Sequence, residues 1–183
     1  NQLAGVPDGW TCTVTETAPT GNLADGSYAW GEPTITPATF VVGDTADLNV
    51  TVENTIERVY APVTLVKIIN DPDFVVDPAR VYTGSWTCQY GTDAPVTGQW
   101  ENTISGGAIT LSEDILVGSE CTATEDELTA PAMNGDPSYT WGTPVIEDAQ
   151  VTAGGGQISV TNPVVRGLGA FTITKEVTGA TEG

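Results

Sequence analysis

Short stretches of alternating apolar and polar residues run along the whole chain, and this alternation predicts β-strands. Successive side chains of a strand point to opposite faces, so every second residue shares a face. Residues 48–54, 63–69, 157–162 and 171–177 alternate in this way. Gly, Pro, Asn and Asp separate such stretches at short intervals, and no stretch has sustained helical periodicity. The pattern therefore predicts an all-β protein.

Several of these stretches return later in the chain in the same order, at a spacing of about 110 residues. This spacing is the length of a whole domain and far exceeds one turn of a solenoid. Each block and its later copy are GWTCTVTET (9–17) and GSECTATED (118–126), SYAWGEPTI (27–35) and SYTWGTPVI (138–146), LNVTVEN (48–54) and QISVTN (157–162), and VTLVKIIND (63–71) and FTITKEVTG (171–179).

The repeat divides the chain into three expected parts. Residues 1–60 form the C-terminal part of a first repeat, residues 61–165 a complete repeat, and residues 170–183 the first strand of a third. The natural protein is thus expected to extend beyond both ends, with linkers near residues 55–62 and 163–170. We expect tandem immunoglobulin-like or prealbumin-like β-sandwich domains of about seven strands each, with the first strand beside the last.

Composition adds a strongly acidic charge and few catalytic residue types. Asp and Glu number 24 against five Lys and Arg, giving a formal charge of −19, and His is absent. Such a charge disfavours binding to nucleic acid or to an anionic membrane surface, and no apolar segment is long enough for membrane insertion. No metal-ligand set, hydrolase triad or phosphate-binding glycine motif is present, so we expect no enzyme activity, cofactor or metal. Calcium stays open at Asp71, Asp73 and Asp77, whose segment lacks a regular ligand loop.

The three cysteines become interpretable through the repeat. Cys88 and Cys121 lie in the complete repeat and can pair. Cys12 is the repeat equivalent of Cys121, so its partner is expected upstream of Asn1; the alternative is a free thiol. Structural disulfides imply an oxidising, extracellular compartment.

Lysine, glutamate and asparagine recur on strand faces that are otherwise apolar. Burying such groups is costly unless they pair, lose their charge or react. A buried neutral lysine can attack an asparagine side-chain carbonyl while a protonated glutamate shuttles protons, which would leave an amide cross-link. Two alternatives stay open, a buried salt bridge with the asparagine nearby, or solvated strand ends. The residues are Lys67, Glu125 and Asn162 in the complete repeat, and Glu16, Asn54 and Lys175 in the partial repeats.

The segments FTITKEVTG, CTVTET and VTVENT resemble repeats of Gram-positive, especially actinobacterial, surface proteins, which are related to collagen-adhesin B-type domains and pilins. In that family a first-strand lysine forms an isopeptide bond with a last-strand asparagine, assisted by a buried acid. The resemblance implies these roles for Lys67, Asn162 and Glu125. It gives Glu16 and Asn54 the same roles toward an unseen upstream lysine, and makes Lys175 the amine of a third domain. The sequences CTATED and TNP of the complete repeat depart from the commoner forms.

The resemblance also implies a function. We expect a structural stalk or filament-shaft repeat of a bacterial cell-surface protein, extracellular and anchored to the cell wall. Its partners would be neighbouring repeats of the same chain, while other domains would bind cell-wall or host-surface ligands. The alternative is an adhesin module whose repeats bind host glycan or protein directly, and ligand binding blocked by Trp substitution would distinguish it.

Overall fold

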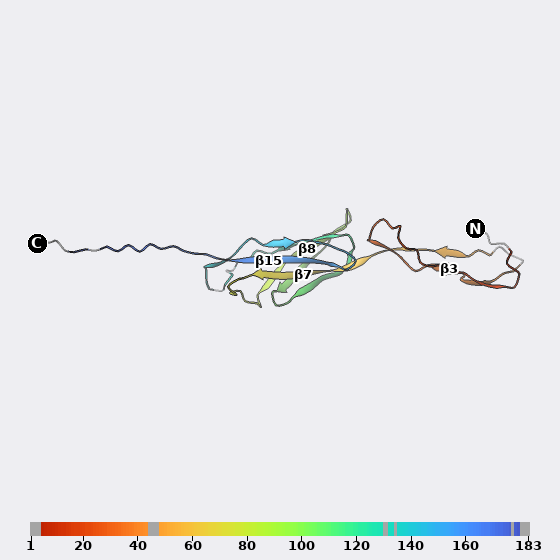
Figure 1. The fold of residues 1–183 in the computed structure, drawn as a ribbon, viewed down its shortest axis with the longest axis horizontal. Helices are drawn as coiled ribbons and strands as arrows, with labels where there is room; N and C mark the ends of the chain where they lie inside the picture. The colour runs from red at the N-terminus through yellow and green to blue at the C-terminus, as the bar shows by residue number, and fades with distance from the viewer. Residues whose placement is uncertain (1–4, 44–47, 130–131, 134, 177, 180–183) are drawn as a thin grey trace.

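The computed structural model describes residues 5–43, 48–129, 132–133, 135–176 and 178–179 (Figure 1). All regular elements of these residues are β-strands, which confirms the all-β prediction. Figure 1 shows three parts along the long axis: the N-terminal strands at one end, a β-sandwich in the middle, and an extended segment at the C-terminal end. The sandwich runs from strand β7 to strand β15.

The sandwich consists of a five-stranded sheet and a four-stranded sheet. The first has the order β10-β7-β15-β12, with β13 also pairing with β15, and the second has the order β14-β11-β8-β9. In chain order the strands are β7 (Tyr60–Asn70), β8 (Val81–Gln89), β9 (Val96–Thr103), β10 (Ala108–Leu116), β11 (Glu120–Glu125), β12 (Tyr139–Trp141), β13 (Val145–Glu147), β14 (Ala149–Gln150) and β15 (Gly156–Arg166).

The first and last strands of the sandwich, β7 and β15, lie side by side, as the sequence predicted, and they run parallel. Their register pairs Leu65 with Ile158 and Lys67 with Val160. Alternate residues of both strands face the second sheet, and Leu65, Ile158 and Val160 are fully buried there. The alternation read from the sequence therefore gave the correct inward face of both strands.

A pair of tryptophans fills the core on the second sheet. Strands β8 and β9 each contain a Gly-x-Trp sequence, and their antiparallel register sets Gly84 opposite Trp100 and Trp86 opposite Gly98. A Cβ atom at Gly84 or Gly98 would lie within 2.8 Å of the indole of the facing tryptophan. Each glycine thus makes room for the ring on the neighbouring strand, and both rings are buried.

Residues 5–58 contain three short strand pairs, β1-β4, β2-β6 and β3-β5. Every buried apolar residue of the described chain lies between Ala61 and Val160, so this part has no apolar core of its own. Trp10, for example, is 61% exposed. The strands are β1 (Thr11–Thr13), β2 (Tyr28–Trp30), β3 (Thr34–Thr36), β4 (Thr39–Val41), β5 (Thr51–Glu53) and β6 (Ile56–Arg58).

Two expectations at the ends of the sandwich are corrected. The linker predicted near residues 55–62 is largely strand, because β6 pairs with β2 up to Arg58 and β7 begins at Tyr60. The linker predicted near residues 163–170 begins inside β15, which continues to Arg166, so only residues 167–170 lie outside a strand. Residues 171–176 were predicted as a strand but make no strand ladder, since no second strand lies beside them to pair with their backbone groups. Val177 and residues 180–183 lie outside the described residues.

Candidate cross-linking site

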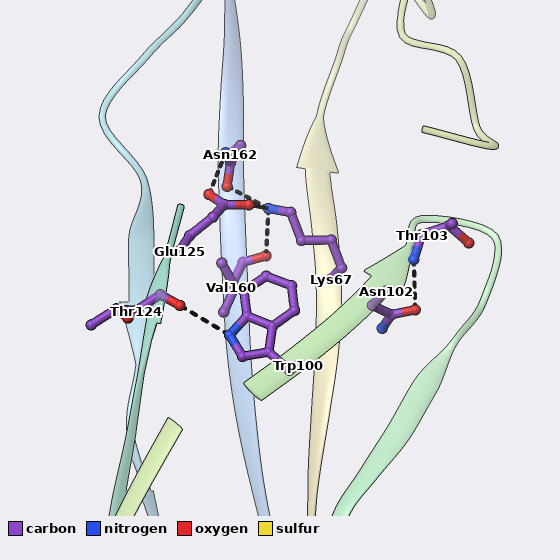
Figure 2. Close-up of polar contacts among 8 residues, drawn as sticks. All are labelled: Lys67, Trp100, Asn102, Thr103, Thr124, Glu125, Val160 and Asn162. Atoms are coloured by element: carbon purple, nitrogen blue, oxygen red, sulfur yellow. Dashed lines mark hydrogen bonds and ion pairs between the residues drawn. The ribbon is translucent and has the colours of Figure 1, made fainter. Parts of the chain in front are cut away.

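The structure brings Lys67, Glu125 and Asn162 together inside the sandwich (Figure 2). Lys67 and Asn162 belong to the adjacent strands β7 and β15, where Asn162 is paired with Ile69, two residues beyond Lys67. Side chains two positions apart share a face, so the lysine and the asparagine both point toward the second sheet. Glu125 reaches them from that sheet, at the end of β11.

The contacts among the three side chains form a closed triangle. The Lys67 Nζ atom donates hydrogen bonds to Oδ1 of Asn162 and, at 3.3 Å, to the carbonyl oxygen of Val160. The same Nζ atom lies 3.1 Å from Oε1 of Glu125. The Asn162 Nδ2 atom donates to Oε2 of Glu125 at 2.6 Å. The two oxygens of one carboxylate therefore contact the amine and the amide nitrogen separately.

The triangle is shielded from water. The side chains of Lys67 and Glu125 are 0% and 3% exposed, and Asn162 is 0% exposed. Burial lowers the pKa of the Lys67 amine, while the charge and the hydrogen bond of Glu125 act in the opposite direction. The solvated alternative, in which the three residues leave the core at the strand ends, is therefore wrong for this repeat.

The ring of Tyr82 covers the lysine from the β8 side. Its centroid lies 4.7 Å from Lys67 Nζ, a cation–π distance. Burial raises the pKa of Tyr82 to about 12, so the phenol stays neutral beside the amine. Sequence reasoning missed this residue, although its inward position on β8 follows from the same alternation.

Glu125 is placed by a glycine and a tryptophan that sequence reasoning also missed. Gly84 is the register partner of Glu125, and a Cβ atom at Gly84 would lie 2.0 Å from the carbonyl oxygen of Thr124. That carbonyl accepts a hydrogen bond from Trp100 Nε1 at 2.9 Å (Figure 2). The absence of a side chain at Gly84 therefore lets the end of β11 approach and lets Trp100 hold it there. The Gly-x-Trp sequence in both strands was the available signal.

The sequence equivalents of Glu125 and Asn162 in the N-terminal part are Glu16 and Asn54. Asn54 Nδ2 donates to Glu16 Oε1 at 3.2 Å, so the two equivalent residues do meet. Both are exposed, as is Lys175. Among the described residues, no opposing sheet covers the faces of these three side chains. Their roles in cross-links completed by other parts of a repeat stay predictions.

The cysteines follow the predicted pattern. Cys88 and Cys121 form a disulfide between the neighbouring strands β8 and β11, which confirms the predicted bond. Cys12 is half-buried and has no disulfide partner among the described residues. Its partner was expected upstream of Asn1 and stays a prediction.

The acidic segment that left calcium open makes internal contacts instead. Oδ2 of Asp71 accepts a hydrogen bond from the backbone amide of Val76, and Oδ1 of Asp77 accepts one from the amide of Ala79, each at 2.8 Å. Among the described residues, no three Asp, Glu, Cys or His side chains are grouped as metal ligands would be. No helix long and apolar enough to cross a membrane occurs in the described part of the chain.

These features define a class of protein: an all-β sandwich with parallel first and last strands, an inter-strand disulfide and a buried Lys–Glu–Asn cluster between its sheets. The chain belongs to the family described as "Domain of unknown function (DUF5979)", whose sequence model matches residues 1–57 and 63–165.

Among solved structures the chain is similar to the major pilin protein (T3.2) of Streptococcus pyogenes serotype GAS13637, with a TM-score of 0.38 and 13% sequence identity. That similarity covers 69% of this chain and 52% of the pilin, so the chain spans about half of the pilin's length. No curated protein matches the sequence.

Proposed function

We propose that this chain is a structural repeat of a stalk or filament shaft at a bacterial cell surface, and that an amide bond between Lys67 and Asn162 closes its complete repeat. One observation carries the proposal: Glu125 contacts the lysine nitrogen with one carboxylate oxygen and the asparagine nitrogen with the other, in a site closed to water. A plain salt bridge does not require the asparagine amide at this place. Condensation requires all three groups there.

The reaction is an amide exchange that needs no further reagent. Oε1 of Glu125 takes a proton from Lys67 Nζ, and burial of the lysine favours the resulting neutral amine. Nζ then attacks Cγ of Asn162, the protonated carboxyl group of Glu125 gives this proton to Nδ2, and the resulting carboxylate accepts the second proton of Nζ. The Nζ–Cγ bond replaces the Cγ–Nδ2 bond, and ammonia leaves with the released proton as ammonium.

The fold supplies the reactivity. An amine and a primary amide do not react with each other at a useful rate in dilute solution. Groups that a fold fixes in contact gain a large effective concentration, which makes their reaction much faster. The register of β7 and β15 and the closing contact from β11 fix all three groups. Each site reacts once and acts on its own chain, so the proposed chemistry is a self-modification and not enzymatic turnover.

The position of the bond suits a protein under tension. The chain enters the sandwich at β7 from the N-terminal part and leaves it from β15 at the opposite end (Figure 1). Tension along the chain therefore shears β7 against β15, two strands otherwise held together by hydrogen bonds. An amide between them would pass the load through a covalent bond. The Cys88–Cys121 disulfide ties two strands of the other sheet.

The disulfide also supports an extracellular location, because such bonds persist in oxidising compartments. Neighbouring repeats of the same chain would be the direct partners in this proposal. Attachment to the cell wall, and any adhesive ligand, would belong to other parts of the protein.

Intact mass under reducing conditions tests the proposed bond. We expect the folded chain to weigh one ammonia less than its sequence, and fragmentation to recover a peptide joining Lys67 to Asn162. Lys67→Met and Asn162→Ala should each abolish the loss, whereas Lys175→Met, which changes the other lysine, should leave it intact. A folded parent chain that shows no ammonia loss would end the cross-link proposal.

A further inference from the structure

The N-terminal part and the sandwich meet in a polar joint built from Asp25, Ser27, Arg58 and Tyr90. Tyr90, in the loop after β8, donates from its hydroxyl to Oδ2 of Asp25 at 3.0 Å and lies 3.1 Å from the hydroxyl of Ser27. Asp25 Oδ1 accepts from both the hydroxyl and the backbone amide of Ser27. The Arg58 guanidinium lies over two rings, 4.7 Å from that of Tyr28 and 5.4 Å from that of Tyr90.

Within this joint, the sandwich covers Ser27. Ser27 is 1% exposed, although its own part of the chain has no apolar core. The backbone runs through the junction as paired chain, because the amide of Val59 donates to the carbonyl of Ser27 and the amide of Val117 donates to that of Val59. A Cβ atom at Gly118 would lie 2.9 Å from the Tyr90 ring, so the glycine makes room for the tyrosine. The joint therefore fixes the sandwich against the part that precedes it.

The opposite end of the sandwich carries the same half-joint. Asp136, Ser138, Tyr139 and Arg166 are the repeat equivalents of Asp25, Ser27, Tyr28 and Arg58. The Ser138 amide donates to Asp136 Oδ1 at 2.9 Å, and Arg166 lies 5.5 Å from the centre of the Tyr139 ring. The amide of Gly167 donates to the carbonyl of Ser138 at 2.7 Å, as Val59 does to Ser27.

The two ends of the sandwich differ in the tyrosine that contacts the aspartate. No tyrosine from a following domain reaches Asp136 within the described residues, and Ser138 stays half-buried where Ser27 is buried. The half-joint is thus already formed on one side and lacks the cover that Tyr90 supplies at the other end.

We propose that the half-joint of Asp136, Ser138 and Arg166 is the docking surface for a following copy of this repeat, which presents a tyrosine at the position of Tyr90. The segment that follows Arg166 favours a following copy of this repeat as the partner of the half-joint. The same number of residues separates Arg166 from Lys175 as separates Arg58 from Lys67, and Phe171 occupies the position of the buried Val63. A following first strand would therefore leave the joint in the same register.

The inference rests on the proposed function only in treating the chain as a row of repeats, and it does not depend on the amide bond. It adds a mechanical property, because successive repeats would be held at one fixed orientation by the same joint and would not pivot on loose linkers. The charges and rings in the joint select a repeat of this kind over an unrelated domain.

A longer chain tests the proposal: residues 1–166 followed by a copy of residues 59–183, so that the added repeat follows Arg166 as the first follows Arg58. Hydrogen–deuterium exchange of the Ser138 amide is compared in this chain and in the parent. We expect at least about fivefold slower exchange in the longer chain, the factor that one hydrogen bond contributes. Tyr90→Phe in the added copy alone should remove the protection, and Tyr60→Phe in the same copy should not.

The joint already present serves as the reference, since Tyr90→Phe in the first repeat should speed exchange at Ser27 and leave Ser138 unchanged. Equal exchange of the Ser138 amide in the parent and the longer chain would overturn the proposal, as would protection that survives Tyr90→Phe in the copy. The count of ammonia molecules lost by the same samples reports on the amide bonds separately, so failure of the joint and failure of the cross-link are distinguishable.

Discussion

Replacing Glu125 with glutamine separates the proton-transfer role of this residue from its packing role. The two side chains have the same shape, and glutamine can still accept the hydrogen bond from Asn162 Nδ2 through its carbonyl oxygen. It cannot take a proton from Lys67 or give one to the leaving nitrogen. The variant should fold and form the disulfide, but it should condense far more slowly than the parent chain. General acid–base catalysis of this kind contributes about 10²–10⁴-fold in rate.

The stability change has two parts that the structure allows to be estimated. The amide would close a loop between Lys67 and Asn162, which are 95 residues apart in sequence. The disulfide already closes 33 of these residues into a smaller loop, so the amide restricts about 62 further residues. The chain-entropy model gives about 4 kcal/mol for a loop of this size. For a domain of roughly 100 residues this corresponds to a fall in Tm of about 15–20 °C. Removing one partner of a buried ion pair costs about 3–5 kcal/mol more while Lys67 stays charged.

The assay follows ammonia loss by intact mass from the moment of refolding and records thermal melting of the same samples. Glu120→Gln, an exposed residue at the start of the same strand, is the matched control and should condense and melt like the parent chain. In the Asn162→Ala background, where neither chain condenses, adding Glu125→Gln isolates the ion-pair contribution from that of the amide.

Two results would refute this reasoning. If Glu125→Gln loses ammonia as fast as the parent chain, the carboxylate is not the proton shuttle. If the variant stays uncondensed but melts at the temperature of a condensed parent, the amide does not contribute the expected loop-closure stability.

Three further predictions concern the surroundings of the site. Cys88→Ser should lower the free energy of unfolding by about 3–4 kcal/mol, since the disulfide closes a loop of 33 residues, and equal denaturation midpoints for variant and parent would contradict this. Gly84→Ala should cost about 1–3 kcal/mol or more by overpacking and should slow condensation. Gly154→Ala should do neither, because a Cβ atom there would make only an ordinary van der Waals contact, 3.8 Å from the Thr152 hydroxyl. Equal ammonia loss and melting in both variants would show that the close approach at Gly84 is unimportant. Burial lowers the pKa of Lys67 below its ordinary value of 10.5. In the uncondensed Asn162→Ala chain the unfolded state should therefore bind more protons than the folded state between the folded pKa and 10.5, and the free energy of unfolding should rise with pH across that window. Adding Lys67→Met should abolish this rise, and a rise that persists in the double variant would assign it to another group.

Much of this protein could be predicted from local patterns. Alternation along the strands identified the inward faces of Lys67 and Asn162, because the period of two is a property of any extended chain. Self-similarity then identified the equivalent residues in the partial repeats and the pairing of Cys88 with Cys121.

The same patterns do not determine burial, which depends on a second sheet. Glu16, Asn54 and Lys175 have inward-facing positions by alternation, yet all three are exposed, because alternation specifies a face but not what covers it. The prediction of a linker near residues 55–62 failed for a related reason: backbone pairing of β6 with β2 depends on a distant segment of chain and leaves little trace in the local sequence.

Only the tertiary structure decided which groups meet. The parallel register that sets Lys67 beside Val160, and so places Asn162 Oδ1 at the amine, is a long-range pairing. The arrival of Glu125 from the opposite sheet depends on the close approach permitted by Gly84. The joint of Ser27 and Tyr90 likewise joins residues 63 apart in sequence. The alternation within a strand determines the face on which each side chain lies. Contact between segments far apart in the chain depends on how whole sheets pack.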